Sequence, residues 1–288
     1  MNNYVIYTDS SCDLKKDLLK SFDVNAESLT FRFVDEDKEY GNDDMEIEEF
    51  YNRMKEGGVA KTAAINTQTF FDSFEKILTE GKDVLYIGFS SGLSTTFNSA
   101  RLAALELNEK YPERKVLVID SLCASAGLGL LVSLAVDEKK KGKSIDEVYS
   151  YIESIKLNIC HWFTVDDLVY LKRGGRVSPT VAFVGNMLGI KPVLHVDNDG
   201  HLINITKVRG RKASIIALAD KYTELALDKE NSRVYISHAF CEADAKELSK
   251  IIEERHGVKA EVITDVGTVI GAHSGPGTLA LFFLGKER

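Results

Sequence analysis

The sequence predicts an α/β protein made of two closely packed domains. Its 288 residues are 44% hydrophobic, which is enough for a substantial core. Up to about Leu157, short β-branched runs alternate with amphipathic stretches, a rhythm typical of a parallel sheet with helices on both faces. After Leu157 an Asp-Gly pair separates two strand-like runs and indicates an antiparallel hairpin. We therefore expect an α/β domain at 1–157 and an α+β domain at 158–288, with no Pro/Ser linker between them.

The first domain is predicted from alternating periodicities. Runs rich in Val, Ile, Tyr and Phe, bounded by polar residues, predict strands at 4–9, 28–34, 83–89 and 115–120. Apolar residues at helical spacing predict helices at 45–57 and 67–81, with a weaker strand-like segment at 59–62 between them. The longest apolar stretch, 124–136, is too short to span a bilayer and predicts a buried helix.

The second domain opens with the predicted hairpin at 192–208. The pattern that follows predicts a helix at about 212–228, a strand at 233–239, a helix at about 241–256 and a strand at 260–265. A Gly/Pro turn at 271–277 then leads into a last core strand at 279–285. This mixture of hairpin and alternating elements is typical of an α+β domain.

Charge and cysteine content exclude several classes of protein. The formal net charge of -8 argues against a nucleic-acid binder, which needs a basic surface to neutralise phosphates. The four cysteines are scattered without a C-x-x-C pair, so we expect neither a metal site nor a disulfide framework. The first residues enter a strand without a basic and apolar leader, and we therefore expect a cytoplasmic protein with no stable membrane insertion.

Hydroxyl side chains follow the predicted strands of the first domain. In parallel sheets, ligands bind beyond the carboxyl ends of the strands, so these positions are candidates for a site. Helix capping explains Ser11, Asp13 and Ser121. The segment 90–100, "SSGLSTTFNSA", contains more hydroxyls than a cap needs and precedes a helix whose free amides can hold an anion. The remaining candidate in such a position is Thr62.

A serine hydrolase is the enzymatic alternative. Gly88-Phe89-Ser90-Ser91-Gly92 matches the nucleophile-elbow pattern after a strand, and Asp265 and His273 could complete a triad. The pattern is short, however, and no oxyanion segment of the HGGG type is present in the sequence. Asp265 also stands only eight residues before His273.

Several motifs together resemble the DegV family of fatty-acid-binding proteins, the acyl-carrying subunits of bacterial fatty acid kinase. They run through nearly the whole chain: "YTDSSCDL", "KTAAINTQTF", "SSGLSTTFNSA", "IDSLCASAGLG", "LVYLKRGGRV", "IKPVLHVDNDGHL", "KVRGRKA" and "GAHSGPGTLALFF". Two departures concern the loops. Ser94-Thr95-Thr96 stands where the family usually has Ser-Gly-Thr, and Thr62-Ala63-Ala64-Ile65 where it has Thr-Ser-Gln-Pro.

The resemblance implies a fatty-acid carboxylate held by Thr62, Ser94 and His273. Hydroxyls and an imidazole N–H are suitable donors to a carboxylate. Supporting residues in the same loops are Asp9, Ser10, Thr95, Thr96 and Gly275. The acyl tail is expected in an internal tunnel between or beside the two domains, with candidate walls at 124–136 and 181–190.

The resemblance also implies a carrier without catalytic residues, cofactor or metal. A separate ATP-dependent kinase would phosphorylate the bound acid. Arg176 and Arg209 are expected to lie near the carboxylate mouth and to serve the interaction with that kinase. The expected partners are thus a long-chain fatty acid and the kinase subunit, with no nucleic acid.

Overall fold

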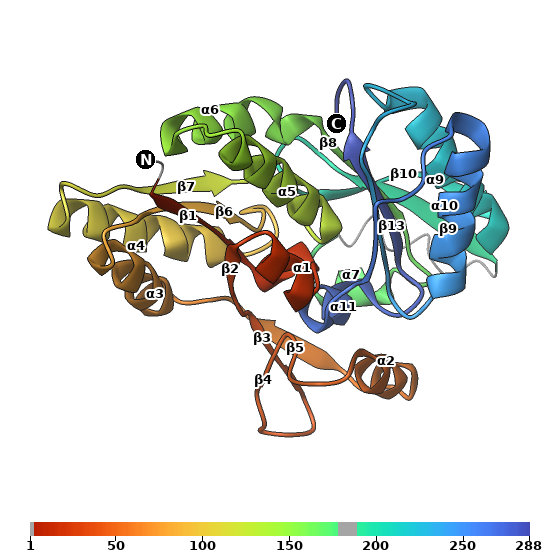
Figure 1. Ribbon diagram of the computed structural model, residues 1–288. Coiled ribbons are helices and arrows are strands. Elements are labelled where there is room, and N and C mark those ends of the chain that lie inside the picture. The colour runs from red at the N-terminus through yellow and green to blue at the C-terminus, as the bar shows by residue number, and fades with distance from the viewer. Residues whose placement is uncertain (1–2, 178–188) are drawn as a thin grey trace.

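A four-stranded parallel sheet forms the first part of the fold. The computed structural model describes residues 3–177 and 189–288. The strands β1 (Tyr4–Asp9), β2 (Val24–Glu27), β6 (Asp83–Gly88) and β7 (Val116–Asp120) lie in the order β2-β1-β6-β7. Every pairing between them is parallel. Helices α3 (Thr67–Thr79) and α4 (Thr96–Lys110) cover one face, and α5 (Ala126–Lys140) and α6 (Ile145–Ile155) cover the other (Figure 1).

A small antiparallel sheet stands apart from the parallel one. It joins β3 (Thr30–Phe33), β4 (Tyr40–Gly41) and β5 (Ala60–Ala63) in the order β4-β3-β5, beside α2 (Ile47–Lys55) (Figure 1). The expectation that the strand at 28–34 belongs to the parallel sheet is therefore wrong. In β3 the buried Phe31 and Phe33 flank the exposed Arg32, a pattern typical of an antiparallel strand with one solvated face. The place beside β1 is taken by β2, which the sequence analysis missed.

A six-stranded mixed sheet forms the other half of the molecule. It contains β8 (Ile159–Thr164), β9 (Ile190–Val196), β10 (Leu202–Arg209), β11 (Val234–His238), β12 (Val262–Asp265) and β13 (Leu279–Leu284). Their order is β10-β9-β8-β13-β11-β12, and among the described strands only β11 and β12 pair in parallel. β9 and β10 form the hairpin that the Asp-Gly pair predicted. β13 lies between β8 and β11, inside the sheet.

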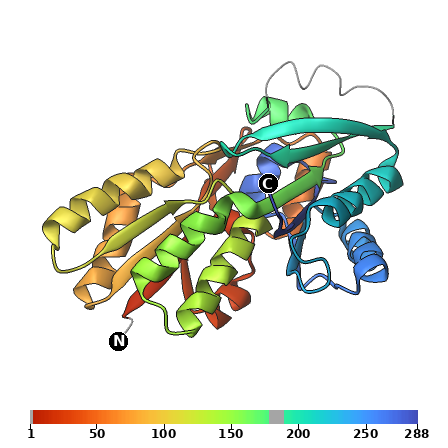
Figure 2. The same cartoon turned by 90° about the horizontal axis from the view of Figure 1, so that it is seen from above.

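Helix α5 links the two larger sheets. It contacts β1 and β6 of the parallel sheet, and β8, β11 and β13 of the mixed sheet. The helices α9 (Arg211–Leu225) and α10 (Glu242–His256) cover the opposite face of the mixed sheet (Figures 1 and 2). The α/β fold class with a parallel sheet is thus confirmed. The division at residue 157 stays a prediction, although β8 begins at Ile159.

The short elements complete the frame around the loops. They are the 3₁₀ turns Ser10–Cys12 and Lys156–Asn158, with helices α1 (Lys16–Ser21), α7 (Val169–Arg173) and α11 (Thr268–Ser274). The expected turn at 271–277 is wrong in its first half, because residues 271–274 form the last turn of α11. Within 3–177 and 189–288, no helix combines the length and apolar character that a bilayer crossing demands.

Candidate functional site

A cavity of about 490 Å³ lies where the loops of the parallel sheet meet the mixed sheet. Its lining comes from both halves of the chain: the segments after β2, β5, β6 and β7, together with α7, α11 and the mixed sheet. Most of the wall is apolar. Representative wall residues are Phe89, Leu93, Phe163, Leu171, Val269 and Phe282. Such a cavity suits a long apolar ligand better than a polar metabolite.

Thr62 and His273 meet at the wall of this cavity. Thr62 lies in β5 and His273 in the last turn of α11, and the Thr62 Oγ1 to His273 Nε2 distance is 2.8 Å. His273 Nδ1 is buried and has no hydrogen-bond partner within the described chain. Burial, reinforced by the nearby charge of Arg176, lowers the pKa of His273 to about 4. The imidazole is therefore neutral at physiological pH and can present either one N–H donor or one lone pair.

Ser94 lies in the turn between β6 and α4 and also lines the cavity. Its hydroxyl is 2.9 Å from Thr96 Oγ1 and accepts a hydrogen bond of 3.2 Å from the Thr96 amide. Thr95 contributes to the wall, whereas Thr96 is fully buried behind it. The structure thus brings Thr62, Ser94 and His273 to one cavity.

Arg176 joins these residues in the wall. Its Nε and Nη2 donate to the Leu93 carbonyl at 3.1 and 3.0 Å, and Nη1 donates to the Gly174 carbonyl. Burial lowers the pKa of the guanidinium, which nevertheless stays charged at neutral pH. The resemblance implies that Arg176 lies near the carboxylate mouth and serves a kinase contact. Its position puts a fixed positive charge beside Ser94 and His273, and the kinase contact stays a prediction.

Two glycines let α7 pack closely on α11. A Cβ at Gly174 would overlap the imidazole of His273. Gly275, which ends α11, has φ +80, and a Cβ there would overlap the ring of Tyr170. Gly275 therefore supports the position of the helix that carries His273.

Besides Thr96 and Gly275, three more of the residues named from the sequence lie outside the cavity wall: Asp9, Ser10 and Arg209. Asp9 is fully buried, where its carboxylate accepts hydrogen bonds from the Tyr86 hydroxyl (2.7 Å) and the Phe89 amide (2.9 Å). Burial raises its pKa. The Ser10 hydroxyl accepts a bond of 3.0 Å from the Leu29 amide. Both residues fix the loops. Arg209 is exposed at the end of β10 and forms no ion pair or hydrogen bond with the described residues.

The structure does not support the serine hydrolase alternative. Ser90 is fully buried, and its hydroxyl donates to the Gly200 carbonyl at 2.9 Å under the β9–β10 turn. Asp265 faces His238, at 3.7 Å between Oδ1 and Nδ1. His273 instead contacts Thr62. The three proposed triad members therefore have different partners, and the G-x-S-x-G pattern here belongs to a buried turn.

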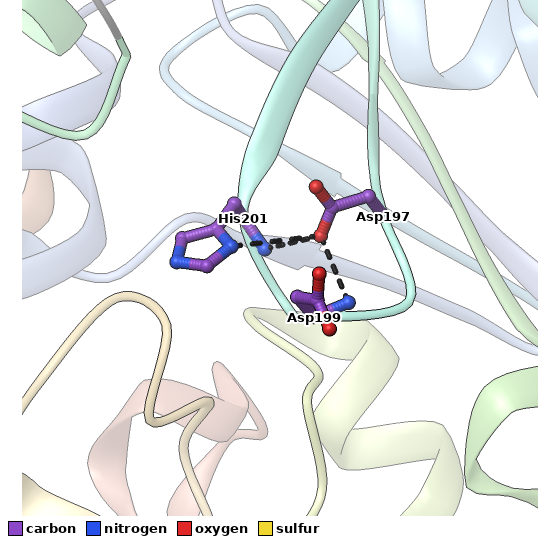
Figure 3. A group of neighbouring side chains, drawn as sticks. All are labelled: Asp197, Asp199 and His201. Atoms are coloured by element: carbon purple, nitrogen blue, oxygen red, sulfur yellow. Dashed lines mark hydrogen bonds and ion pairs between the residues drawn. The ribbon is translucent and has the colours of Figure 1, made fainter.

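One group of potential metal ligands, Asp197, Asp199 and His201, lies on the β9–β10 turn (Figure 3). Asp197 Oδ1 accepts hydrogen bonds from the amides of Asp199 and His201 at 3.0 and 2.8 Å. This arrangement is that of an Asp that stabilises a tight turn through its own backbone neighbours. The cluster is explained by hairpin geometry.

Among the polar wall residues, Ser91 and Ser125 lie in segments singled out from the sequence but were not named there, whereas His161, Ser237, Ser274 and Thr278 were not expected in the site. Ser125 follows β7, so the rule that ligands gather after parallel strands could have found it. Ser237 lies inside β11, where local sequence gives no signal. Of the expected tunnel walls, only Ala124 and Ser125 of 124–136 line the cavity, while 181–188 lie outside the described residues.

Known proteins are similar to this chain in fold and in sequence over nearly their full length. A family model described as an uncharacterised protein of the DegV family matches residues 3–286. A DegV domain-containing protein of Clostridium perfringens is 42% identical over 100% of this chain and 99% of its own.

Two solved structures carry ligand information. A protein from Thermotoga maritima, described as revealing fatty acid binding function, has 31% identity and a TM-score of 0.86, with 99% of this chain and 100% of its own covered. A stearic acid-binding protein from Eubacterium ventriosum has 27% identity and a TM-score of 0.88, with 98% of each chain covered.

Proposed function

This chain belongs to the DegV family, and from that premise we propose that it binds a long-chain fatty acid inside the cavity, with the carboxylate held by Thr62, Ser94 and His273. The observation that carries the proposal is the meeting of these three side chains with Arg176 in the wall of a mostly apolar cavity. The fatty-acid ligands of the Thermotoga and Eubacterium relatives support it.

The donor set fits a carboxylate. Ser94 can donate its hydroxyl proton to one carboxylate oxygen. When His273 Nε2 carries the imidazole proton, it donates to Thr62 Oγ1 and leaves the Thr62 hydroxyl free to donate to the carboxylate. Arg176 supplies the positive charge that a buried anion requires, without needing a change of protonation. A bound carboxylate would raise the pKa of His273 above its ligand-free value of about 4, so the imidazole bond would strengthen on binding.

The apolar wall accounts for the tail. Burial of roughly sixteen carbons at about 0.8 kcal/mol each contributes on the order of 12 kcal/mol. Association and ordering of the chain offset much of this gain. Tight binding therefore requires that the tail lie against the apolar wall residues of the cavity and away from water.

The protein then acts as a carrier and performs no chemistry of its own. It presents the carboxylate to a separate ATP-dependent kinase in the cytoplasm, with Arg209 at the contact surface. The exposed, unpaired state of Arg209 among the described residues supports this role. Residues 1–157 and 158–288 form two domains, each providing part of the ligand site.

The test is identification of a native ligand. Protein purified from a bacterial host should carry about one equivalent of a long-chain fatty acid, measured by native mass spectrometry and then by denaturing extraction. Delipidated protein should take up added palmitate or oleate. If no acyl chain is extracted and none is taken up, the proposed function is wrong.

A further inference from the structure

A second group of hydroxyls lines the same cavity. Ser125 stands at the N-cap position of α5 without a side-chain capping hydrogen bond, and Ser237 lies in β11. Neither belongs to the elements that carry Thr62, Ser94 and His273. Their two Oγ atoms are 2.9 Å apart, and both side chains are buried. The Ser125 hydroxyl donates to Asp13 Oδ2 at 2.5 Å. A lipid cavity therefore has a polar patch that the carboxylate site does not need.

The backbone holds Ser125 in this position at a conformational cost. Its φ of 53 and ψ of -148 belong to a region that residues with a Cβ rarely adopt. The neighbouring Ala124 amide donates to His161 Nε2 at 3.2 Å, and the Leu128 amide donates to the Ser125 carbonyl at 2.9 Å. These contacts keep the strained turn in place. Strain of this kind is typical of ligand sites.

The hydroxyl oxygen of Ser237 has lone pairs that the neighbouring hydrogen bonds do not use. Asp13 Oδ1 accepts from the Gly267 amide at 3.0 Å, and Oδ2 accepts from Ser125. Since the single Ser125 proton is used there, Ser237 must donate to Ser125. The lone pairs of Ser237 Oγ then have no partner in the part of the chain that the structure describes. Both ring nitrogens of nearby His161 are already hydrogen-bonded.

The hydrogen bonds that link Asp13, Ser125 and Ser237 can also point in the opposite direction. Burial raises the pKa of Asp13 to about 8, so its carboxyl is largely protonated at neutral pH. A protonated Asp13 can donate to Ser125, which then donates to Ser237 and leaves the Ser237 proton free for the cavity. The patch can thus accept or donate, and an aliphatic hydroxyl is the neutral ligand group that can also do both.

We propose that Ser125 and Ser237 form a second subsite that binds a hydroxyl on the acyl chain, so that the cavity prefers a hydroxylated fatty acid to its unsubstituted counterpart. This inference rests on the proposed function. A methylene placed against the patch leaves a buried polar group unpaired, whereas a hydroxyl satisfies it, and the difference corresponds to about tenfold in affinity.

The experiment compares stearic acid with a series of hydroxystearic acids that differ in the position of the hydroxyl. Delipidated protein is titrated with each acid, and dissociation constants are measured by calorimetry. We expect at least one isomer to bind roughly tenfold more tightly than stearic acid. Ser237→Ala and Ser125→Gly should remove this preference, so that stearic acid and the preferred hydroxylated isomer bind each variant with similar affinity. Ser125→Gly also tolerates the positive φ, which protects the fold.

The matched control is Ser133→Ala. Ser133 is a buried serine of the same helix that donates to the Leu130 carbonyl and does not line the cavity. Its variant should keep the preference for the hydroxylated acid. Weaker binding of every isomer than of stearic acid, or a preference that survives in both Ser237→Ala and Ser125→Gly, overturns the subsite. Absence of stearic acid binding by the parent overturns the carrier function itself and, with it, the subsite.

Discussion

His273 occupies a segment with little side chain around it because the space is needed for the ring. Gly174 faces the imidazole directly, and the neighbouring Thr62 provides its hydrogen bond. The family motif could predict His273, Thr62 and Ser94, since each lies in a short and specific sequence pattern. The resemblance also placed Arg176 near the carboxylate mouth, but its three hydrogen bonds to backbone carbonyls could not be predicted, because no local pattern reveals them.

The buried His273 should make stability depend on pH. Its folded-state pKa of about 4 lies below the ordinary value of 6.5, so the unfolded chain binds the proton first as the pH falls. The neutral imidazole therefore contributes about 3 kcal/mol to the free energy of unfolding. This contribution is complete above about pH 6.5 and is lost progressively as the pH falls to about 4. When the free energy of unfolding is measured with urea at several pH values across this range, it should depend less steeply on pH in His273→Gln than in the parent. His201→Gln, at an exposed histidine, should follow the parent; equal slopes for all three proteins would refute the assignment.

Removing single donors should weaken fatty-acid binding without abolishing it. Thr62→Val and Ser94→Ala each take a hydroxyl from a buried carboxylate, which should cost roughly 1 to 3 kcal/mol. The tail contacts remain. Dissociation constants from calorimetry with palmitate test this expectation, with Ser150→Ala on the exposed face of α6 as the control. Parent-like affinity in both cavity variants would place the carboxylate elsewhere.

At the scale of elements, prediction succeeded where a strand is buried on both faces and failed where local pattern is ambiguous. β6 and β13 are continuous apolar runs, and both were expected within one or two residues. Residues 271–274 were expected as a turn because of their glycines, yet α11 forms because it packs against α7 and α2. Tertiary contacts thus override a weak local propensity.

The packing of α7 on α11 makes Gly174 a sensitive position. Gly174→Ala keeps an allowed backbone conformation, since its φ is -73, but the new methyl displaces the imidazole. We expect affinity for palmitate to fall roughly tenfold or more, because His273 loses its place beside Thr62. Val169→Ala, at an exposed residue of the same helix, should bind normally. Normal binding by Gly174→Ala would show that His273 is dispensable or can relocate freely.

At the scale of the whole molecule, the cavity arises from long-range assembly. Its wall combines loops of the parallel sheet with strands of the mixed sheet, and the approach of these parts depends on α5 between them. Composition and periodicity predicted two packed parts but carry no information on which side chains meet across them. The pairing of Ser125 with Ser237, for example, joins residues 112 positions apart.

Arg209 is expected to act in the proposed presentation of the fatty-acid carboxylate to the kinase. The chain carries a net charge of -8, and Arg209 stands exposed and unpaired among the described residues. Arg209→Ala should leave fatty-acid occupancy unchanged and strongly reduce ATP-dependent acyl-phosphate formation by the cognate kinase. Arg209→Lys should restore only part of the rate, because an ammonium lacks the planar fork of a guanidinium.

Both quantities should be measured in the same preparations, with Lys207→Ala as a variant that removes equal charge from the same strand. If Arg209→Ala loses both bound fatty acid and acyl-phosphate formation, Arg209 contributes to the binding site or to the fold. Unchanged phosphorylation would remove it from the kinase surface.

The internal position of β13 also determines when the protein can begin to work during its synthesis. Residues 279–284 pair with β8 on one side and β11 on the other. A nascent chain that ends before Leu279 therefore leaves two strand edges open and the surfaces around them uncovered. This strand must leave the ribosome before the mixed sheet can close. The proposed loading of a fatty acid therefore cannot precede that point, and until then the open strand edges expose the nascent chain to aggregation.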